Sequence, residues 1–478
     1  MINKKTNRRD FLTKTAIASV GFTVIPSIAM GKTLGHTAPS DKLNIAAVGA
    51  GGKGRGDIRD CATENIVALC DVDWERAKGT FEQYPNAKKY WDWRKMFDEM
   101  GKSIDAVIVS TPDHTHAIVA AHAMTMGKHA FVQKPLTLTV SESRLLTQLA
   151  AKYKVATQMG NQGASGEGVR QICNWIWDGQ LGEIREVHAW TNRPIWPQGL
   201  RRPTEIDEVP DTLNWDLFLG VAPFRPYHRS YTPFNWRGWW DFGTGALGDM
   251  ACHILDPVFR SLKLKYPTSI IGSSTDVNTE TAPQAEKVHL IYPKRESFNK
   301  LNLPEVKVTW YDGGLMPERP LELPEGKGMG ASDGGVLFVG EKDKLICGCY
   351  GASPYLLSGR TPSSPELMRV ATHHHQDWVR ACKESPANRV PCHSDFAYAG
   401  PFNEMVVMGV LAVRLQKLNR WLQWDGENMR FTNISDTDKF SVTNGNPAVQ
   451  GRNVEMNAKQ AAEEFVHRVY REGWSLPA

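Results

Sequence analysis

Short apolar runs alternate with amphipathic stretches over the part of the chain from Lys42 to about Met159. Apolar runs bounded by turn residues are typical of strands buried on both faces, and the amphipathic stretches between them are typical of helices. This alternation predicts a doubly wound parallel sheet. The predicted strands are 43–48, 66–70, 104–110, 129–132 and 155–159, and the predicted helices include 118–126 and 141–153.

Beyond Gly160 the apolar positions alternate with polar ones, which is typical of strands with one buried and one solvated face. The pattern predicts an α+β domain over 161–440 with a largely antiparallel open sheet, and a C-terminal extension over 441–478. The predicted strands are 184–190, 269–272, 287–292, 306–311, 335–340 and 344–348. The predicted helices are 166–178, 376–381, 402–416 and 458–470.

A glycine-rich segment lies between the first two predicted strands. Gly49, Gly51 and Gly54 have Gly-x-Gly-x-x-Gly spacing, and Asp71 ends the second strand. In a dinucleotide-binding βαβ unit such glycines permit a tight turn, close approach of a pyrophosphate and close packing of helix on strand. The carboxylate of Asp71 can accept hydrogen bonds from the ribose hydroxyls, and its negative charge would repel a 2′-phosphate. The fold class is therefore predicted as α/β, with a Rossmann domain over 42–160 that binds NAD. Arg76 is close enough to weaken the preference for NAD over NADP.

Several polar residues, one glycine and one proline lie at the carboxyl ends of the predicted parallel strands, where ligands bind in such sheets. They are Gly49, Asp71, Pro112, Lys134 and Asn161. Lys134 precedes Pro135, which holds the preceding backbone extended. A lysine facing a nicotinamide can hydrogen-bond the reacting hydroxyl, and desolvation can lower its pKa. A surface lysine at a strand end is the alternative interpretation.

Asp249 and His253 are four residues apart on a predicted helix, so both side chains would point into one cleft. Histidine titrates near neutrality, which suits a base that accepts a hydroxyl proton. A core histidine paired with the aspartate is an equally good interpretation. A zinc site would need a third ligand, which His373–His375 with Asp377 could offer. A hydrated helix start is the commoner explanation, so the sequence predicts no metal.

The long loop over 192–242 is rich in proline, tryptophan and arginine. Aromatic rings pack against the apolar faces of sugars, while arginine and aspartate bind the hydroxyls. Trp236, Arg237 and Asp241 are therefore candidate substrate-binding residues, together with Asp249 and His253. A loop pinned by buried tryptophans is the alternative, and both interpretations can hold at once.

Charge and cysteine content exclude several other classes. The formal charge is +4, and residues 1–31 alone carry five basic side chains and one acidic one. The remainder is neutral overall, so no global field attracts nucleic acid or an anionic membrane. The eight cysteines show no metal-binding spacing, and several lie in apolar runs, so we expect buried free thiols.

The first 31 residues are predicted to be an export signal. Asn7-Arg8-Arg9-Asp10-Phe11-Leu12 resembles the twin-arginine motif and precedes an apolar stretch over 16–30. That stretch is too short and too often interrupted to form a stable membrane span. We therefore expect the twin-arginine machinery to export the folded protein to the periplasm.

Taken together, the motifs resemble those of the Gfo/Idh/MocA oxidoreductases. The segments that carry the resemblance are Gly49–Gly54, Ser110–His116, Gln133-Lys134-Pro135 and Asp249–His253. The resemblance implies a catalytic Lys134 and an Asp249–His253 pair with the histidine as acid/base. It also implies a cofactor-binding set of Gly49, Gly51, Gly54, Asp71, Thr111, Pro112, His114, His116, Gln133, Lys134 and Asn161. Gln133 stands where the family usually has glutamate, which alters the charge beside the lysine.

The resemblance implies hydride transfer between NAD and a secondary hydroxyl of a sugar or cyclitol. Free NAD is scarce outside the cytoplasm, so we expect a tightly bound cofactor and a glycoside dehydrogenase that acts at a ring carbon, most plausibly C3. One alternative is a redox-neutral glycosidase that works by oxidation, elimination, water addition and re-reduction, as in relatives that cleave N-acetylgalactosaminides. A non-catalytic sugar-binding protein is an alternative of another class. By analogy we expect a homodimer or a tetramer.

Overall fold

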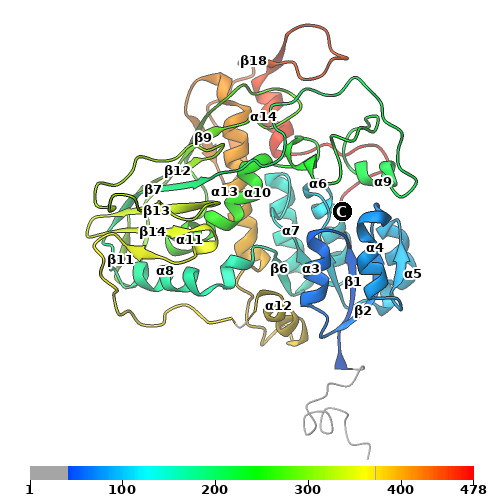
Figure 1. Ribbon diagram of the computed structural model, residues 1–478, viewed down its shortest axis with the longest axis horizontal. Coiled ribbons are helices and arrows are strands. Elements are labelled where there is room, and N and C mark those ends of the chain that lie inside the picture. The colour runs from blue at the N-terminus through cyan, green and yellow to red at the C-terminus, as the bar shows by residue number, and fades with distance from the viewer. Residues whose placement is uncertain (1–40, 372, 478) are drawn as a thin grey trace, which may run out of the picture.

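The computed structural model describes residues 41–371 and 373–477. The predicted export signal over 1–31 lies outside the described residues. Two sheets dominate the described chain, and Figure 1 shows them side by side with the long helix α13 (Phe396–Arg414) running between them.

The first sheet has six parallel strands in the order β3-β2-β1-β4-β5-β6, which confirms the predicted Rossmann domain. Its apolar central strands are buried on both faces, as the continuous hydrophobic runs require. The strands are β1 (Asn44–Val48), β2 (Asn65–Cys70), β3 (Lys88–Tyr90), β4 (Ala106–Val109), β5 (His129–Val132) and β6 (Thr157–Met159). The helices are α3 (Lys53–Asp60), α4 (Trp74–Gln83), α5 (Trp93–Met100), α6 (Asp113–Thr125) and α7 (Val140–Tyr153).

The second sheet has nine strands in the order β15-β14-β13-β7-β12-β9-β8-β16-β17. All neighbouring pairs are antiparallel except β7 with β12, so the sheet is mixed and largely antiparallel, as predicted. Its main strands are β7 (Ile184–Thr191), β8 (Ser269–Ser274), β9 (Glu286–Tyr292), β12 (Val306–Tyr311), β13 (Gly334–Gly340) and β14 (Lys344–Gly348). Its edge strands are β15 (Tyr355–Leu356), β16 (Leu422–Asp425) and β17 (Arg430–Phe431).

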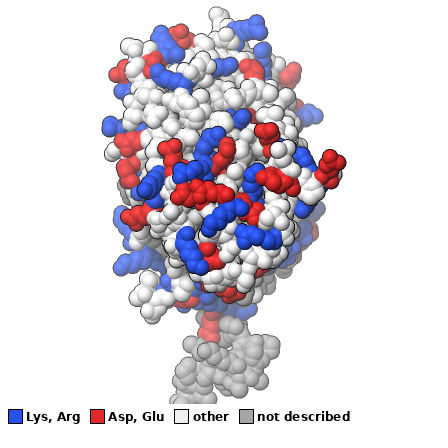
Figure 2. All heavy atoms as spheres, turned by 90° about the vertical axis from the view of Figure 1, so that its left-hand side faces the viewer, with Lys and Arg blue, Asp and Glu red and all other residues white. Residues whose placement is uncertain are grey.

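Helices cover one face of this sheet and leave much of the other to polar side chains. On β7, β9 and β12 buried Val187, Val288 and Val308 share the main core with α8 (Glu167–Trp177), α10 (Gly245–Ile254), α11 (Asp256–Ser261) and α13. Glu186 and Lys307 pair on the opposite face at 3.0 Å. On the side of the molecule drawn in Figure 2, basic and acidic side chains are interspersed rather than gathered by sign. The predicted self-association of this sheet stays a prediction.

Two helices from late in the chain return to the Rossmann domain. α12 (His374–Lys383) buries Trp378 and Val379 against Ile45, Ile58 and Phe131. α13 has the length and composition of a membrane-crossing helix, but 83% of its apolar window is buried inside the protein, so it serves as a core helix. Two hairpins were not predicted: β10 (Arg295–Phe298) with β11 (Leu301–Leu303), and β18 (Lys439–Thr443) with β19 (Asn453–Asn457), which leads into α14 (Ala458–Val466).

All eight cysteines are free and buried, which confirms the expectation from their apolar surroundings. Two helices, α6 and α13, begin more than one turn earlier than predicted. α6 starts at Asp113, because Pro112 occupies its N-cap while the polar first turn hides the helical period. α13 starts at Phe396, where Asp395 accepts a hydrogen bond from the Tyr398 amide, and continues through Pro401.

A buried ion pair joins α13 to the Rossmann helix α7. Arg144 donates to both carboxylate oxygens of Glu404, at 2.7 and 3.1 Å, and the Trp424 indole donates to the same carboxylate at 3.2 Å. Glu404 is fully buried, so its negative charge depends on these donors.

We expect Arg144→Met to lower the free energy of unfolding by about 3–5 kcal/mol, because it leaves the Glu404 carboxylate buried without its counter-ion. Chemical denaturation measures the loss. Arg144→Met/Glu404→Gln is the matched control and should regain part of it, since no unpaired charge remains. A single variant within about 1 kcal/mol of the wild type would contradict this account of the ion pair.

Candidate active site

A cavity of about 450 Å³ opens at the carboxyl ends of the Rossmann strands. Seven of the predicted cofactor residues line it: Gly49, Gly51, Asp71, Thr111, Pro112, Gln133 and Lys134. Its far wall is built by the second domain, including Arg237, Asp249 and His253. The cavity therefore brings the glycine loop and the predicted catalytic residues into one space.

The glycine loop has the close contacts that its spacing predicted. A Cβ at Gly54 would lie 1.9 Å from the Gly49 carbonyl oxygen, so only glycine lets α3 approach the end of β1. Gly49 has a φ of +85°, and a Cβ there would lie 2.5 Å from the backbone of Ser110. The amides at the start of α3 have no side-chain cap, which suits a phosphate ligand. These residues fit a dinucleotide.

Asp71 binds the loop itself. One of its carboxylate oxygens accepts hydrogen bonds from the amides of Ala50 and Gly51, at 2.7 and 3.0 Å, and the other accepts from the Asp73 amide at 2.9 Å. The oxygen that accepts from Asp73 keeps a second lone pair, and its contact with a ribose hydroxyl stays a prediction. The Arg76 side chain lies over Gly51 and Gly52, the position from which it was expected to influence the nucleotide.

Four predicted cofactor residues do not line the cavity. Gly54 packs beneath the loop, and the His114 ring is buried with Nε2 2.8 Å from the Phe218 carbonyl oxygen. The Asn161 amide donates to Asp256 at 3.1 Å. The ring nitrogens of His116 lie 2.8 Å from the carbonyl oxygens of Thr111 and Pro135, so this histidine joins the two turns that carry Pro112 and Lys134.

Lys134 crosses the cleft to the second domain. Its Nζ donates to Oδ1 of Asp249 at 2.8 Å and to the Asp249 carbonyl oxygen at 3.0 Å, and Arg237 Nε donates to the same Oδ1 at 3.1 Å. Burial would raise the pKa of Asp249, but the charges of Lys134 and Arg237 outweigh it and hold the pKa well below its usual value. The aspartate is thus a fixed carboxylate that orients two cations.

His253 is a neutral imidazole in the same cavity. Burial and the nearby charge of Lys134 lower its pKa well below the usual value. Its Nδ1 is buried without a hydrogen-bond partner, and the ring lies 4.6 Å from that of Tyr350. The residue lines the cavity, and a neutral imidazole in a cavity wall can accept a proton from a bound hydroxyl.

Gln133, at the position where Gfo/Idh/MocA proteins usually have glutamate, is hydrogen-bonded to the carboxylate of Asp57. Its side-chain amide donates to Asp57 Oδ2 at 2.9 Å, and the Ser110 hydroxyl donates to the same oxygen at 2.9 Å. Burial would raise the pKa of Asp57, but hydrogen bonds from His375 and Lys53 outweigh it and lower the pKa. A glutamate at 133 would face this carboxylate, whereas the glutamine donates to it.

Asp113 is an ionisable residue of the cavity that the sequence analysis did not single out. The Thr244 hydroxyl donates to its carboxyl group at 2.9 Å. Burial raises the pKa of Asp113 to about 7, although the charges of Arg237 and Lys134 act against the rise. A carboxyl group that titrates near neutrality beside the Lys134–Asp249 pair can move a proton at physiological pH.

Aromatic residues form the outer wall of the cavity. Trp236 and Arg237 line it, with the guanidinium 4.4 Å from the indole ring, while Asp241 lies elsewhere in an ion pair with buried Arg225. The aspartate is therefore placed to hold the loop rather than to reach the cavity. Other lining residues that the sequence analysis missed are Lys53, Arg193, Trp196, Phe234, Tyr350 and Trp474.

Trp474 comes from a C-terminal strap, residues 467–477, that follows α14 and runs back to the Rossmann domain (Figure 1). Tyr470 donates to Glu142 at 2.7 Å, and the Arg471 side chain donates to the Gly220 carbonyl oxygen at 3.0 Å. These contacts place the Trp474 ring over the Arg94 guanidinium at 4.3 Å and at the edge of the cavity. No spacing within the sequence could have indicated this return.

Two family models match the chain. One, described as "Oxidoreductase family, NAD-binding Rossmann fold", matches residues 43–161, and the other, described as "Oxidoreductase family, C-terminal alpha/beta domain", matches residues 183–293. The first match confirms the predicted NAD-binding Rossmann fold.

Similar curated proteins fall into two groups. An inositol 2-dehydrogenase of Salmonella typhimurium is 29% identical over 153 residues, which are 31% of this chain and 45% of that protein. A glycosyl hydrolase family 109 protein of Shewanella pealeana is 27% identical over 208 residues, which are 39% of this chain and 46% of that protein. The chain thus covers less than half the length of either relative.

Solved structures share the fold over most of the chain. The WlbA dehydrogenase of Bordetella pertussis, in complex with NADH and UDP-GlcNAcA, has a TM-score of 0.54 at 14% identity, covering 80% of this chain and 99% of that one. An inositol dehydrogenase homolog of Azotobacter vinelandii, with NADH and myo-inositol, has a TM-score of 0.52 at 16% identity, covering 80% and 98%. At these identities the likeness shows the fold.

Asp113 should make stability depend on pH. Its pKa of about 7 in the folded protein exceeds the value of about 3.9 expected when unfolded, so the folded state holds the proton more tightly. The free energy of unfolding should fall as the pH rises between these values and level off above about 7, by up to ~1.4 kcal/mol per pKa unit. Asp113→Asn keeps a hydrogen-bond acceptor for Thr244 but has no carboxyl group to titrate, so it should lack this pH dependence.

Urea unfolding at about pH 5 and about pH 7.5 measures the effect. We expect the wild type to lose stability relative to Asp113→Asn as the pH rises. If the stabilities of the two proteins change in parallel over this range, Asp113 does not titrate as described.

Proposed function

Because residues 43–161 and 183–293 match models of the Gfo/Idh/MocA oxidoreductase family, we propose that the protein transfers hydride between NAD and a secondary ring hydroxyl of a sugar or glycoside. The observation that carries this proposal is the shared cavity, in which Lys134, Asp249 and His253 face the glycine loop. NAD, when bound, accepts the hydride that leaves the carbinol carbon.

The side chains of the cavity divide the remaining work. The Lys134 ammonium group donates a hydrogen bond to the substrate oxygen and stabilises the negative charge that develops there as hydride leaves. His253, a neutral imidazole in the cavity wall, takes the hydroxyl proton. Asp249 remains ionised and keeps Lys134 pointed across the cleft. In the reverse direction His253 returns the proton to the oxygen.

The residues in the outer wall of the cavity favour a sugar as the substrate. Trp236 offers an aromatic face to a sugar ring, and Arg237 offers guanidinium hydrogens to its hydroxyls. We favour a glycoside that is oxidised at C3. Oxidation there makes the C–H bonds beside the new carbonyl group more acidic.

The proposal also includes tight binding of NAD and export of the protein to the periplasm. The C-terminal strap brings Trp474 to the edge of the nucleotide cavity, which supports a cofactor retained through many turnovers. Such retention suits a periplasmic enzyme, and the twin-arginine-like segment Asn7–Leu12 supports export of the folded, loaded protein. Association into a homodimer or tetramer belongs to the same proposal and rests on the half-solvated second sheet.

A redox-neutral glycosidase is the second candidate, favoured by the match to glycosyl hydrolase family 109 relatives. That reaction needs a further acid near the leaving group, and Asp113, with its pKa of about 7, lies in the same cavity. A non-catalytic sugar-binding protein would have no use for the Lys134–Asp249 pair.

Product analysis separates these functions. We expect the purified protein, incubated with a panel of glycosides, to yield a keto-sugar lighter by two hydrogens in mass spectrometry, because hydride and proton leave together. Free aglycone without net oxidation would instead establish the glycosidase. A protein that neither contains nor binds NAD would overturn both enzymatic functions.

Lys134→Ala and His253→Ala should lower turnover by at least about a hundredfold while leaving NAD bound, because neither side chain belongs to the glycine loop. Lys102→Ala, an exposed lysine outside the cavity, is the matched control. Wild-type rates in both site variants would refute the assigned roles.

Trp474→Ala should release NAD faster, because it removes the strap's contribution to the cavity wall. We expect an increase in the dissociation rate on the order of tenfold, the equivalent of about 1.4 kcal/mol. The fluorescence of bound NADH during competition with excess NAD reports this rate. Trp421→Ala, at a partly exposed tryptophan outside the cavity, controls for loss of an indole. Equal rates for the two variants would show that the strap does not retain the cofactor.

A further inference from the structure

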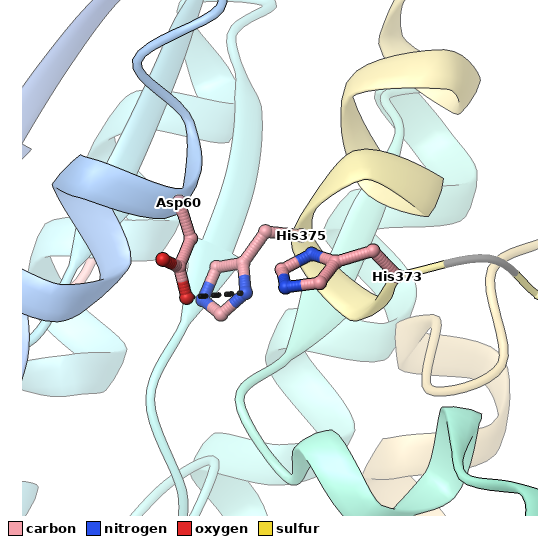
Figure 3. Close-up of side chains that lie close together, drawn as sticks. All are labelled: Asp60, His373 and His375. Atoms are coloured by element: carbon pink, nitrogen blue, oxygen red, sulfur yellow. Dashed lines mark ion pairs between the residues drawn. The ribbon is translucent and has the colours of Figure 1, made fainter.

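Two histidines and an aspartate meet where the end of α3 contacts the start of α12. Figure 3 shows Asp60 on α3 with the rings of His373 and His375 turned toward it. One potential ligand atom from each residue lies within 4.8 Å of the others. None of the three residues lines the cavity that holds the proposed catalytic residues.

The two nitrogens of His375 have different partners. Nε2 lies 2.9 Å from Oδ1 of buried Asp57, so this nitrogen carries the proton and donates it to the carboxylate. The other nitrogen, Nδ1, therefore presents its lone pair at 3.7 Å from Oδ2 of Asp60. A histidine that binds a metal ion typically donates its second N–H to a carboxylate, which fixes the ring and makes the ligating nitrogen more basic.

Asp60 is oriented in a complementary way. The Arg59 guanidinium donates to Oδ1 of Asp60 at 3.0 and 2.9 Å, which leaves Oδ2 turned toward His375. His373 is exposed, so an ion can enter from solvent without passing through the core. The three donors thus combine a fixed imidazole, an oriented carboxylate and an accessible imidazole.

We propose that Asp60, His373 and His375 bind one divalent transition-metal ion of the zinc class. Imidazole and carboxylate donors suit zinc, and three protein ligands leave the fourth position to water. Tetrahedral coordination places ligand atoms about 3.3 Å apart, so the pair at 3.7 Å needs little movement and the exposed His373 supplies the rest. The sequence predicted no metal, because His373–His375 were considered only as a third ligand for the Asp249–His253 pair and a hydrated helix start was the commoner explanation. Their proximity to α3 could not be seen in the sequence.

The bound ion would fasten α12 to α3. It would also hold His375 against Asp57, whose other carboxylate oxygen receives the Gln133 amide, one residue before Lys134. The metal site is thus connected to the proposed catalytic lysine through two hydrogen bonds and one peptide unit. Its role is to position this part of the fold, and it does not depend on which substrate the cavity accepts.

Titration of the full-length protein, first freed of metal by a chelator, with Co²⁺ tests the site. We expect saturable binding of one equivalent with an intense visible band typical of tetrahedral coordination, and displacement of that band by Zn²⁺. His373→Ala and Asp60→Asn should each weaken Co²⁺ binding at least tenfold, because each removes one of three ligands. His467→Ala, which removes an exposed histidine elsewhere, is the matched control and should bind as the wild type does.

Thermal unfolding gives a second readout. Zn²⁺ should raise the midpoint of the wild type and of His467→Ala but not that of His373→Ala, since an ion that binds only the folded state stabilises it. His373 and Asp60 are used because neither is fully buried, whereas loss of His375 would remove one of the donors to buried Asp57. Circular dichroism establishes that each variant is folded. No saturable binding, or equal affinities for His373→Ala and His467→Ala, would overturn the proposal.

Discussion

The buried carboxylate of Asp57 connects parts of the chain that are far apart in sequence. It accepts hydrogen bonds from Ser110 after β4, from Gln133 after β5 and from His375 on α12. A buried carboxylate needs such donors, because an unpaired charge in the interior is strongly destabilising. The requirement therefore fixes the ends of two strands and the returning helix relative to α3, and with them the turn that carries Lys134.

A second set of charges closes the cleft between the domains. Lys134 from the Rossmann domain and Arg237 from the loop region converge on Asp249 of α10. All three side chains are largely shielded from solvent, so their interaction is stronger than that of surface pairs. The charges of Lys134 and Arg237 keep Asp249 ionised, and burial together with the charge of Lys134 keeps His253 neutral. One cluster thus joins the domains and sets the protonation states of the proposed site.

Much of this architecture was predictable from local pattern. The parallel sheet followed from continuous apolar runs, and the glycine loop from its spacing and from Asp71. The alternating strands indicated the second sheet. The starts of α6 and α13 lie earlier than predicted because the polar first turn of α6 and Pro401 in α13 obscure the helical period.

The sequence was less informative where distant segments meet. Asp113 was not singled out within the Ser110–His116 segment, although burial beside Lys134 raises the pKa of this cavity residue to about 7. Asp241 was expected at the substrate, yet it neutralises buried Arg225. Tyr350 and Trp474 reach the cavity from segments that no motif connects with Lys134. The strap that carries Trp474 has a consequence for folding: Tyr470 and Glu142, which anchor the strap, are 328 residues apart, so this wall of the cavity closes only after distant parts of the chain have met.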